Sequence, residues 1–79
     1  MQVTVFTKPY CPACQRMKGA LTREGIAFEE NNIEPGVLQF FREQGFRSAP
    51  VVRVEHGDDV QYFAGDDPQR VIDTVKGAA

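Results

Sequence analysis

Hydrophobic residues recur along this chain with two spacings, one typical of strands and one typical of helices. Short runs rich in β-branched and aromatic residues predict strands over residues 2–7, 26–33, 50–55 and 59–63. Apolar residues three and four positions apart predict helices over about 12–24, 35–45 and 68–76. The predicted order is βαβαββα, an α/β fold in which a four-stranded sheet carries helices on both faces.

The connections between these elements predict how the strands pair. The succession of strand, helix and strand over residues 2–33 implies a parallel crossover. The sequence His56-Gly57-Asp58 has the chemistry of a hairpin turn, so the last two strands should be antiparallel neighbours. We therefore expect a mixed sheet, in a single domain that occupies residues 1–79.

The chain's two cysteines, Cys11 and Cys14, form a Cys-x-x-Cys pair where the first predicted strand meets the first predicted helix. Cys11 therefore lies at a helix N-terminus, where free N–H groups and the helix dipole favour a thiolate. Pro12 suits the first turn of that helix, which needs no N–H from it. Because thiol–disulfide exchange needs one attacking and one resolving sulfur, we expect Cys11 to be the exposed nucleophile and Cys14 the more buried resolver.

Composition and charge exclude several classes of function. The net charge of −2 argues against nucleic acid as a partner, since a nucleic-acid site has a basic footprint. The apolar runs are too short to span a membrane, and the N-terminus lacks the layout of a signal peptide. A disulfide between the two cysteines would close too short a loop to stabilise a secreted domain. We expect a cytoplasmic monomer in which the cysteine pair has a chemical role.

Three stretches of the chain carry distinctive motifs. They are Thr7-Lys8-Pro9-Tyr10-Cys11-Pro12-Ala13-Cys14, Gly45-Phe46-Arg47-Ser48-Ala49-Pro50-Val51-Val52 and Phe63-Ala64-Gly65-Asp66-Asp67-Pro68. Together they resemble the thioredoxin fold in its minimal glutaredoxin form, over essentially the whole chain. The resemblance implies strand order 2-1-3-4 with the third strand antiparallel to the first. It also implies a cis peptide bond at Pro50, which would face the cysteines and present the backbone of Ala49 to an extended substrate or to glutathione.

Two branches of the glutaredoxin family share features with this sequence. Glutathione-dependent glutaredoxins resemble it in Cys-Pro-x-Cys and in the acidic pair before the last helix, which that branch uses to bind glutathione. NrdH-redoxins, which serve ribonucleotide reductase and take electrons from thioredoxin reductase, resemble it in short length and in Gly-Phe-Arg-x-x-Pro-Val-Val. The sequence departs from the second branch at Phe63 and Asp66, where a Trp and a Phe are usual, and lacks the usual Gln between the cysteines.

Several residues near the motifs have two interpretations each. Asp66 and Asp67, after Gly65, either cap the last helix or help its N-terminus to hold glutathione. Tyr10 either packs against the cysteines or forms one wall of a substrate groove. Lys8 favours the thiolate or is a solvated loop lysine. Arg47 contacts an anionic substrate or is a surface arginine.

The motifs favour a dithiol redoxin that reduces protein disulfides and needs no bound cofactor. By resemblance its client is ribonucleotide reductase and its reductant thioredoxin reductase, and the alternative is a glutathione-dependent glutaredoxin. Three interpretations from other classes compete with this hypothesis. They are half of a zinc site, for which the chain lacks a second cysteine pair, an iron–sulfur cluster bridged between subunits with glutathione, and a non-catalytic interaction module.

Overall fold

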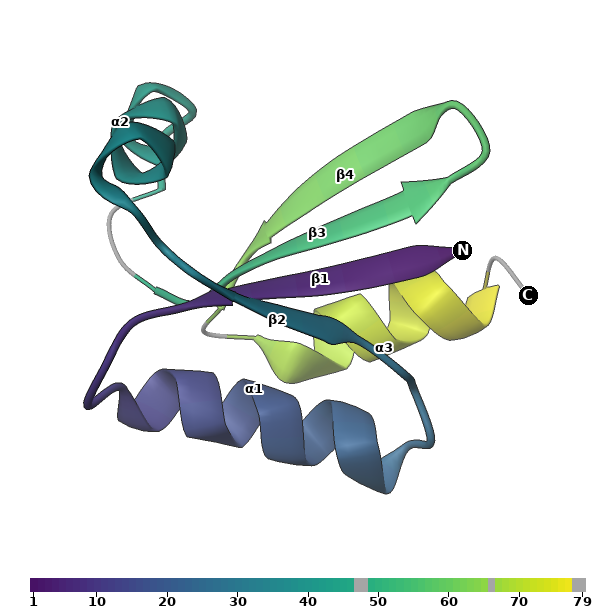
Figure 1. The fold of residues 1–79 in the computed structure, drawn as a ribbon. Coiled ribbons are helices and arrows are strands. Elements are labelled where there is room, and N and C mark those ends of the chain that lie inside the picture. The colour runs from purple at the N-terminus through teal and green to yellow at the C-terminus, as the bar shows by residue number, and fades with distance from the viewer. Residues whose placement is uncertain (47–48, 66, 78–79) are drawn as a thin grey trace.

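The computed structural model describes residues 1–46, 49–65 and 67–77, which form a four-stranded sheet with helices on both sides (Figure 1). The predicted order βαβαββα is confirmed. Its elements are β1 (Gln2–Thr7), α1 (Pro12–Arg23), β2 (Glu29–Asn32), α2 (Pro35–Glu43), β3 (Val51–His56), β4 (Asp59–Ala64) and α3 (Pro68–Gly77).

The sheet is mixed, with strand order β2-β1-β3-β4. β1 and β2 are parallel, whereas β3 is antiparallel to both β1 and β4. The turn between β3 and β4 places Gly57 at φ 62°, a left-handed conformation that glycine adopts without a steric penalty. The predicted hairpin and the strand order implied by the glutaredoxin resemblance are therefore both confirmed.

The second strand is shorter than predicted, because β2 covers only Glu29–Asn32 of the expected range 26–33. The chain leaves α1 through Gly25, which has φ 71°, and the N–H of Ile26 donates to the carbonyl oxygen of Leu21 at 2.9 Å. This hydrogen bond belongs to a helix C-cap and is not part of a strand ladder. Ile26 and Phe28 then pack against the core beneath α1, so sheet pairing begins only after them.

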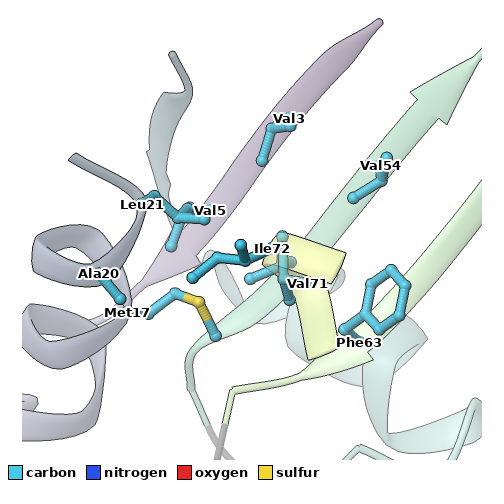
Figure 2. Packing of buried hydrophobic residues seen from close by; sticks show 10 residues of the cluster. Val3, Val5, Met17, Ala20, Leu21, Val54, Phe63, Val71 and Ile72 are labelled. Atoms are coloured by element: carbon cyan, nitrogen blue, oxygen red, sulfur yellow. The ribbon is translucent and has the colours of Figure 1, made fainter. Parts of the chain in front are cut away.

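β1 runs through the middle of the core and is buried on both of its faces. Val3 and Val5 point to one side of the sheet, where α1 and α3 pack over them. Phe6 points to the other side, where it meets Phe41 of α2 with ring centroids 5.0 Å apart. The aliphatic side is drawn in Figure 2, and its cluster consists of Val3, Val5, Met17, Ala20, Leu21, Val52, Val54, Phe63, Val71 and Ile72. Packing on both sides of β1 thus fixes the position of the strand that precedes the loop to the cysteine pair.

Candidate redox site

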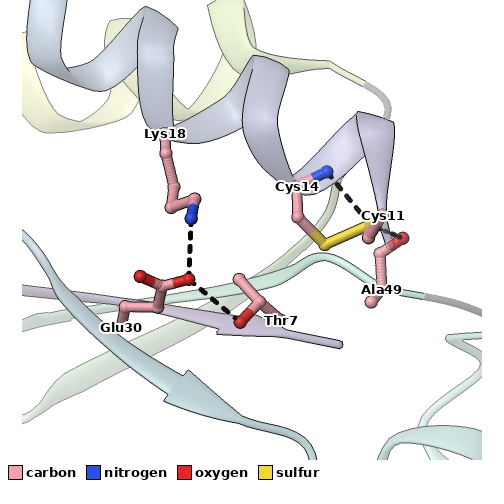
Figure 3. The surroundings of a disulfide bond; sticks show 6 residues. All are labelled: Thr7, Cys11, Cys14, Lys18, Glu30 and Ala49. Carbon is pink, nitrogen blue, oxygen red and sulfur yellow. Dashed lines mark hydrogen bonds and ion pairs between the residues drawn. A yellow bond between two sulfur atoms is a disulfide. The ribbon is translucent and has the colours of Figure 1, made fainter. Parts of the chain in front are cut away.

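The two cysteines are joined in a disulfide across the first turn of α1 (Figure 3). Cys11 is the N-cap residue, in extended conformation at φ −114° and ψ 99°, and Cys14 is three residues further on. Their Cα atoms are 5.2 Å apart, a separation that one helical turn supplies. Strand β1, the loop after it and Pro12 at the start of α1 therefore bring the sulfurs together with no other element required.

Burial differs between the two sulfurs in the predicted direction. Cys14 is 1% exposed and Cys11 is 7% exposed, so Cys14 is the more deeply buried of the two. The expectation that Cys11 would be exposed is wrong for this disulfide form, because Cys11 packs in one cluster with Cys14 and Ala49. Both cysteines are therefore buried in the disulfide form, and Cys11 keeps the larger exposed fraction of the two.

The backbone of α1 supports negative charge on Cys11. The N–H of Cys14 donates to Cys11 Sγ at 3.1 Å, in the position of an N-cap hydrogen bond. The first turn of α1 carries no acidic side chain that would oppose an anion there. When the disulfide is reduced, this N–H and the positive end of the helix dipole favour the thiolate of Cys11 over its thiol.

A second segment, at the start of β3, forms the wall opposite Cys11. The carbonyl oxygen of Ala49 lies 3.7 Å from Cys11 Sγ, and the Ala49–Pro50 peptide bond is cis, as the glutaredoxin resemblance implies. Because a disulfide sulfur carries no proton, this approach is a contact in the present state, and only a thiol at Cys11 would donate to the oxygen. Pro50 itself is fully buried.

A third segment, after β4, packs directly on Pro50. A Cβ atom placed on Gly65 would collide with the ring carbons and the carbonyl oxygen of Pro50. Only glycine therefore lets this segment lie so close to the wall. The sequence indicates Gly65 only as part of a family motif before the last helix, and its packing role against Pro50 was missed because nothing local to residue 65 signals it.

Of the acidic pair before α3, the structure describes Asp67. Asp67 Oδ1 accepts a hydrogen bond of 3.3 Å from the N–H of Arg70, which confirms that Asp67 caps the helix. The other two sequence candidates of this region, Asp66 and Arg47, lie outside the described residues. A cap at Asp67 is compatible with either interpretation of the pair, because a capped helix N-terminus still carries further free N–H groups.

Three candidate residues around the cysteines face solvent. Tyr10 is fully exposed, with φ 57°, so the interpretation in which it packs against the cysteines is wrong and the groove-wall interpretation stays a prediction. Lys8 and Pro12 are also exposed. Within the described ranges no carboxylate forms an ion pair with Lys8.

One group of polar residues near the disulfide was not predicted as part of the site. Glu30 of β2 accepts a hydrogen bond of 2.8 Å from Lys18 Nζ and another of 3.2 Å from the hydroxyl of Thr7 (Figure 3). Lys18 lies one helical turn beyond Cys14, so the group lies along the same side of α1. The hydrogen bond from Lys18 lowers the pKa of Glu30, helped by Thr7 and by the charge of Lys18 and opposed by partial desolvation.

The described part of the chain contains no cluster of three or more His, Cys, Asp or Glu residues that could hold a metal ion. None of the described helices is both long enough and apolar enough to cross a membrane. The disulfide between Cys11 and Cys14 can undergo thiol–disulfide exchange with the thiols or disulfide of another molecule.

Sequence comparisons find that this chain is similar to glutaredoxins and to glutaredoxin-like proteins. The profile of the Glutaredoxin family matches residues 3–59. The "Glutaredoxin-like protein NrdH" of Lactococcus lactis is 42% identical over 52 residues, which cover 63% of this chain and 72% of the relative. The protein of the same name from Escherichia coli is 37% identical over 54 residues, 66% of this chain and 67% of the relative. Glutaredoxin 3 of E. coli is 27% identical over 78 residues, 95% of this chain and 89% of the relative.

Structure comparisons confirm the predicted thioredoxin fold. The NrdH-redoxin of E. coli, described as a glutaredoxin-like protein with a thioredoxin-like activity profile, superposes with a TM-score of 0.75 and 32% identity. That match covers 91% of this chain and 92% of the E. coli chain. Thioredoxin f2 of Chlamydomonas reinhardtii shares the fold at a TM-score of 0.68 and 14% identity, covering 95% of this chain and 75% of its own.

Proposed function

The chain belongs to the glutaredoxin family, in its NrdH-redoxin branch, and on that premise we propose that it reduces protein disulfides through Cys11 and Cys14. Membership makes it a thiol–disulfide oxidoreductase, a carrier of redox electrons. The single observation that carries the proposal is the disulfide across the first turn of α1, with the N–H of Cys14 directed at Cys11 Sγ.

The proposed cycle has two exchange steps. The Cys11 thiolate attacks one sulfur of the partner's disulfide, so that a mixed disulfide forms and the partner's other sulfur leaves as a thiolate. Cys14, deprotonated, then attacks Cys11 Sγ, and the partner's second sulfur leaves. The partner has gained two electrons and, at neutral pH, two protons, while Cys11 and Cys14 end as the disulfide that this structure contains.

The other residues are assigned to partner binding. Ala49 and Pro50 present backbone beside Cys11, and Gly65 supports that wall from behind. We assign Lys8, Tyr10 and Pro12 to the rim of the same surface because they are exposed around the cysteine turn. Arg47, Asp66 and Asp67 complete the proposed substrate-binding set: Lys8, Tyr10, Pro12, Arg47, Ala49, Pro50, Gly65, Asp66 and Asp67.

The proposed reductant is thioredoxin reductase and the proposed client is ribonucleotide reductase. The support is the branch of the family, together with the thioredoxin-like activity profile described for the E. coli NrdH-redoxin. We further propose that residues 1–79 act as one monomeric domain in the bacterial cytoplasm, where reducing conditions keep such a dithiol in its reduced form.

A glutathione-dependent glutaredoxin is the second candidate. Glutaredoxin 3 of E. coli matches 95% of this chain, more than the NrdH relatives cover, although at only 27% identity. The acidic pair before α3, of which Asp67 caps the helix, is the feature shared with that branch. In this alternative Ala49, Pro50, Gly65, Asp66 and Asp67 would bind glutathione.

The test measures NADPH consumption with a protein disulfide as substrate. One arm contains thioredoxin reductase, and the other contains glutathione and glutathione reductase, with Cys11→Ser as the blank in both. We expect turnover in the first arm only. Turnover in the glutathione arm alone would establish the second candidate, and no turnover in either arm would refute the redoxin hypothesis.

A further inference from the structure

A groove of about 450 Å³ runs between α1 and α3, the two helices that cover the same side of the sheet. Figure 1 shows these helices side by side. Its walls include Gln15, Arg16 and Arg23 of α1 and Pro68 and Gln69 of α3. One end of the groove lies near the start of α1, since its lining begins at Gln15, the residue after Cys14. It then follows α1 away from the disulfide.

Small residues keep this groove open. Gly19, in the middle of α1, has no side chain, and Ala20 next to it has only a methyl group. Ala20 and Ile72 line the groove and are buried core residues, 9% and 4% exposed, whose packing in the core is drawn in Figure 2. The helices therefore touch at the core but leave a channel above it.

The groove carries positive charge that the described residues do not neutralise. Arg16 and Arg23 form no ion pair with any described carboxylate. The one acidic residue in the lining, Glu24, is already bound by Lys76 at 2.7 Å. The Arg23 Nη1 atom lies 3.5 Å from the position that a Cβ on Gly19 would occupy, so its guanidinium lies back over the channel.

We propose that this groove binds an extended acidic segment of the protein that exchanges disulfides with Cys11, next to the attacked cysteine in that partner's chain. The inference rests on the proposed function for the identity of that partner. Guanidinium groups bind carboxylates through paired hydrogen bonds, which suits Arg16 and Arg23 to acidic side chains. The two arginines are seven positions apart on the helix, a rise of about 10 Å. An extended chain covers about 10 Å in three residues, so acidic residues at positions i and i+3 match the pair.

The test compares two synthetic peptides that each contain a disulfide-closed loop. One carries Glu at positions i and i+3 beside the attacked cysteine, and the matched peptide carries Gln at both. We expect the wild-type protein to reduce the acidic peptide about tenfold faster, since each exposed ion pair contributes up to about fivefold. The ratio of the two rates should fall toward one at high salt, because exposed pairs are screened.

The variant R16E/R23E should abolish or invert this preference, measured as the ratio of the rates with the two peptides. The matched control is Arg42→Glu, an exposed arginine in the last turn of α2 on the other side of the sheet, and it should keep the preference. Equal rates with both peptides in the wild type, or a preference that survives in R16E/R23E, would overturn the proposal.

A binding measurement separates this proposal from the redox hypothesis. The acidic peptide with both cysteines replaced by Ser is titrated into the oxidised protein, and amide shifts are followed by NMR. We expect salt-sensitive shifts along α1 and α3 that R16E/R23E removes, whether or not the disulfide peptides are reduced. Absence of these shifts would refute the groove even if reduction proceeds normally.

Discussion

Two regions form the redox site. The cysteine turn, residues 11–14 at the start of α1, holds the disulfide, and the wall formed by Ala49, Pro50 and Gly65 packs beside it. The turn is a continuous stretch of chain whose geometry follows from the helix that it begins. The wall is assembled from two segments, one before β3 and one after β4. Its atoms meet Cys11 only because the sheet places β3 next to β1.

This difference separates the chemistry of the site from its shape. The turn supplies both sulfurs and the N–H that favours a thiolate, so the exchange reaction depends on residues of one helix end. The wall covers Cys11 with the backbone of Ala49, and Gly65 packs on the buried ring of Pro50. We therefore expect substitutions in the turn to act on turnover and substitutions in the wall to act on stability and partner binding.

The largest effect is expected from Cys14→Ser in the turn. Cys11 can still attack a partner disulfide in this variant, but no second thiol resolves the mixed disulfide. Turnover with a protein disulfide should fall to the level of the Cys11→Ser blank, while a covalent complex with the substrate accumulates. Non-reducing gel electrophoresis detects the complex. A Cys14→Ser variant that turns over at the wild-type rate would show that Cys14 is not the resolving residue.

In the wall, Gly65→Ala should destabilise the fold. The new Cβ would overlap Pro50, and relieving the overlap requires the two segments to move apart. Overpacking of this kind costs about 1–3 kcal/mol in the free energy of unfolding. Urea denaturation measures the loss. The matched control is Gly36→Ala in α2, where no heavy atom lies within 4 Å of the added Cβ and alanine favours the helix. Equal stability of the two variants would contradict the packing role of Gly65.

Asp67→Ala tests the capped N-terminus of α3, which follows Gly65 of the wall along the chain. Loss of the hydrogen bond from the Arg70 N–H should cost about 1 kcal/mol in the free energy of unfolding. Asp67→Asn keeps an accepting oxygen and should recover most of that stability. The same pair of variants separates the two roles of the residue. If Asp67 only caps α3, the glutathione dependence of any activity stays unchanged in Asp67→Asn, whereas a binding role requires the negative charge.

How much the sequence predicted follows the same division. The cysteine turn, Pro12 at the helix start, the hairpin at Gly57 and the cap at Asp67 each depend on neighbouring residues, and all were predicted. The position of Ala49 beside Cys11 was expected only from the glutaredoxin resemblance, and the contact between Gly65 and Pro50 was missed, because both depend on strand pairing that local patterns do not encode. The late start of β2 was missed because a C-cap after α1 uses the residues whose hydrophobicity predicted a strand.

The smallest effect is expected from Glu30→Gln on β2, whose carboxylate pairs with Lys18 of α1. The hydrogen bonds from Lys18 and Thr7 lower the pKa of Glu30 below its ordinary value of 4.5, so the folded state favours the carboxylate. A lowered folded pKa contributes stability that is fully present above the unfolded value and is lost as the pH falls through the folded one. Wild type should therefore exceed Glu30→Gln by a constant margin near neutral pH, and the margin should vanish as the pH falls below about 4.5. Urea unfolding of both proteins across this range measures the margin. Glu29→Gln, one residue earlier on β2 and without a side-chain hydrogen bond or ion pair among the described residues, is the control and should leave the stability near that of the wild type. A margin that is independent of pH would contradict this prediction, because it would mean that the charge of Glu30 does not stabilise the fold.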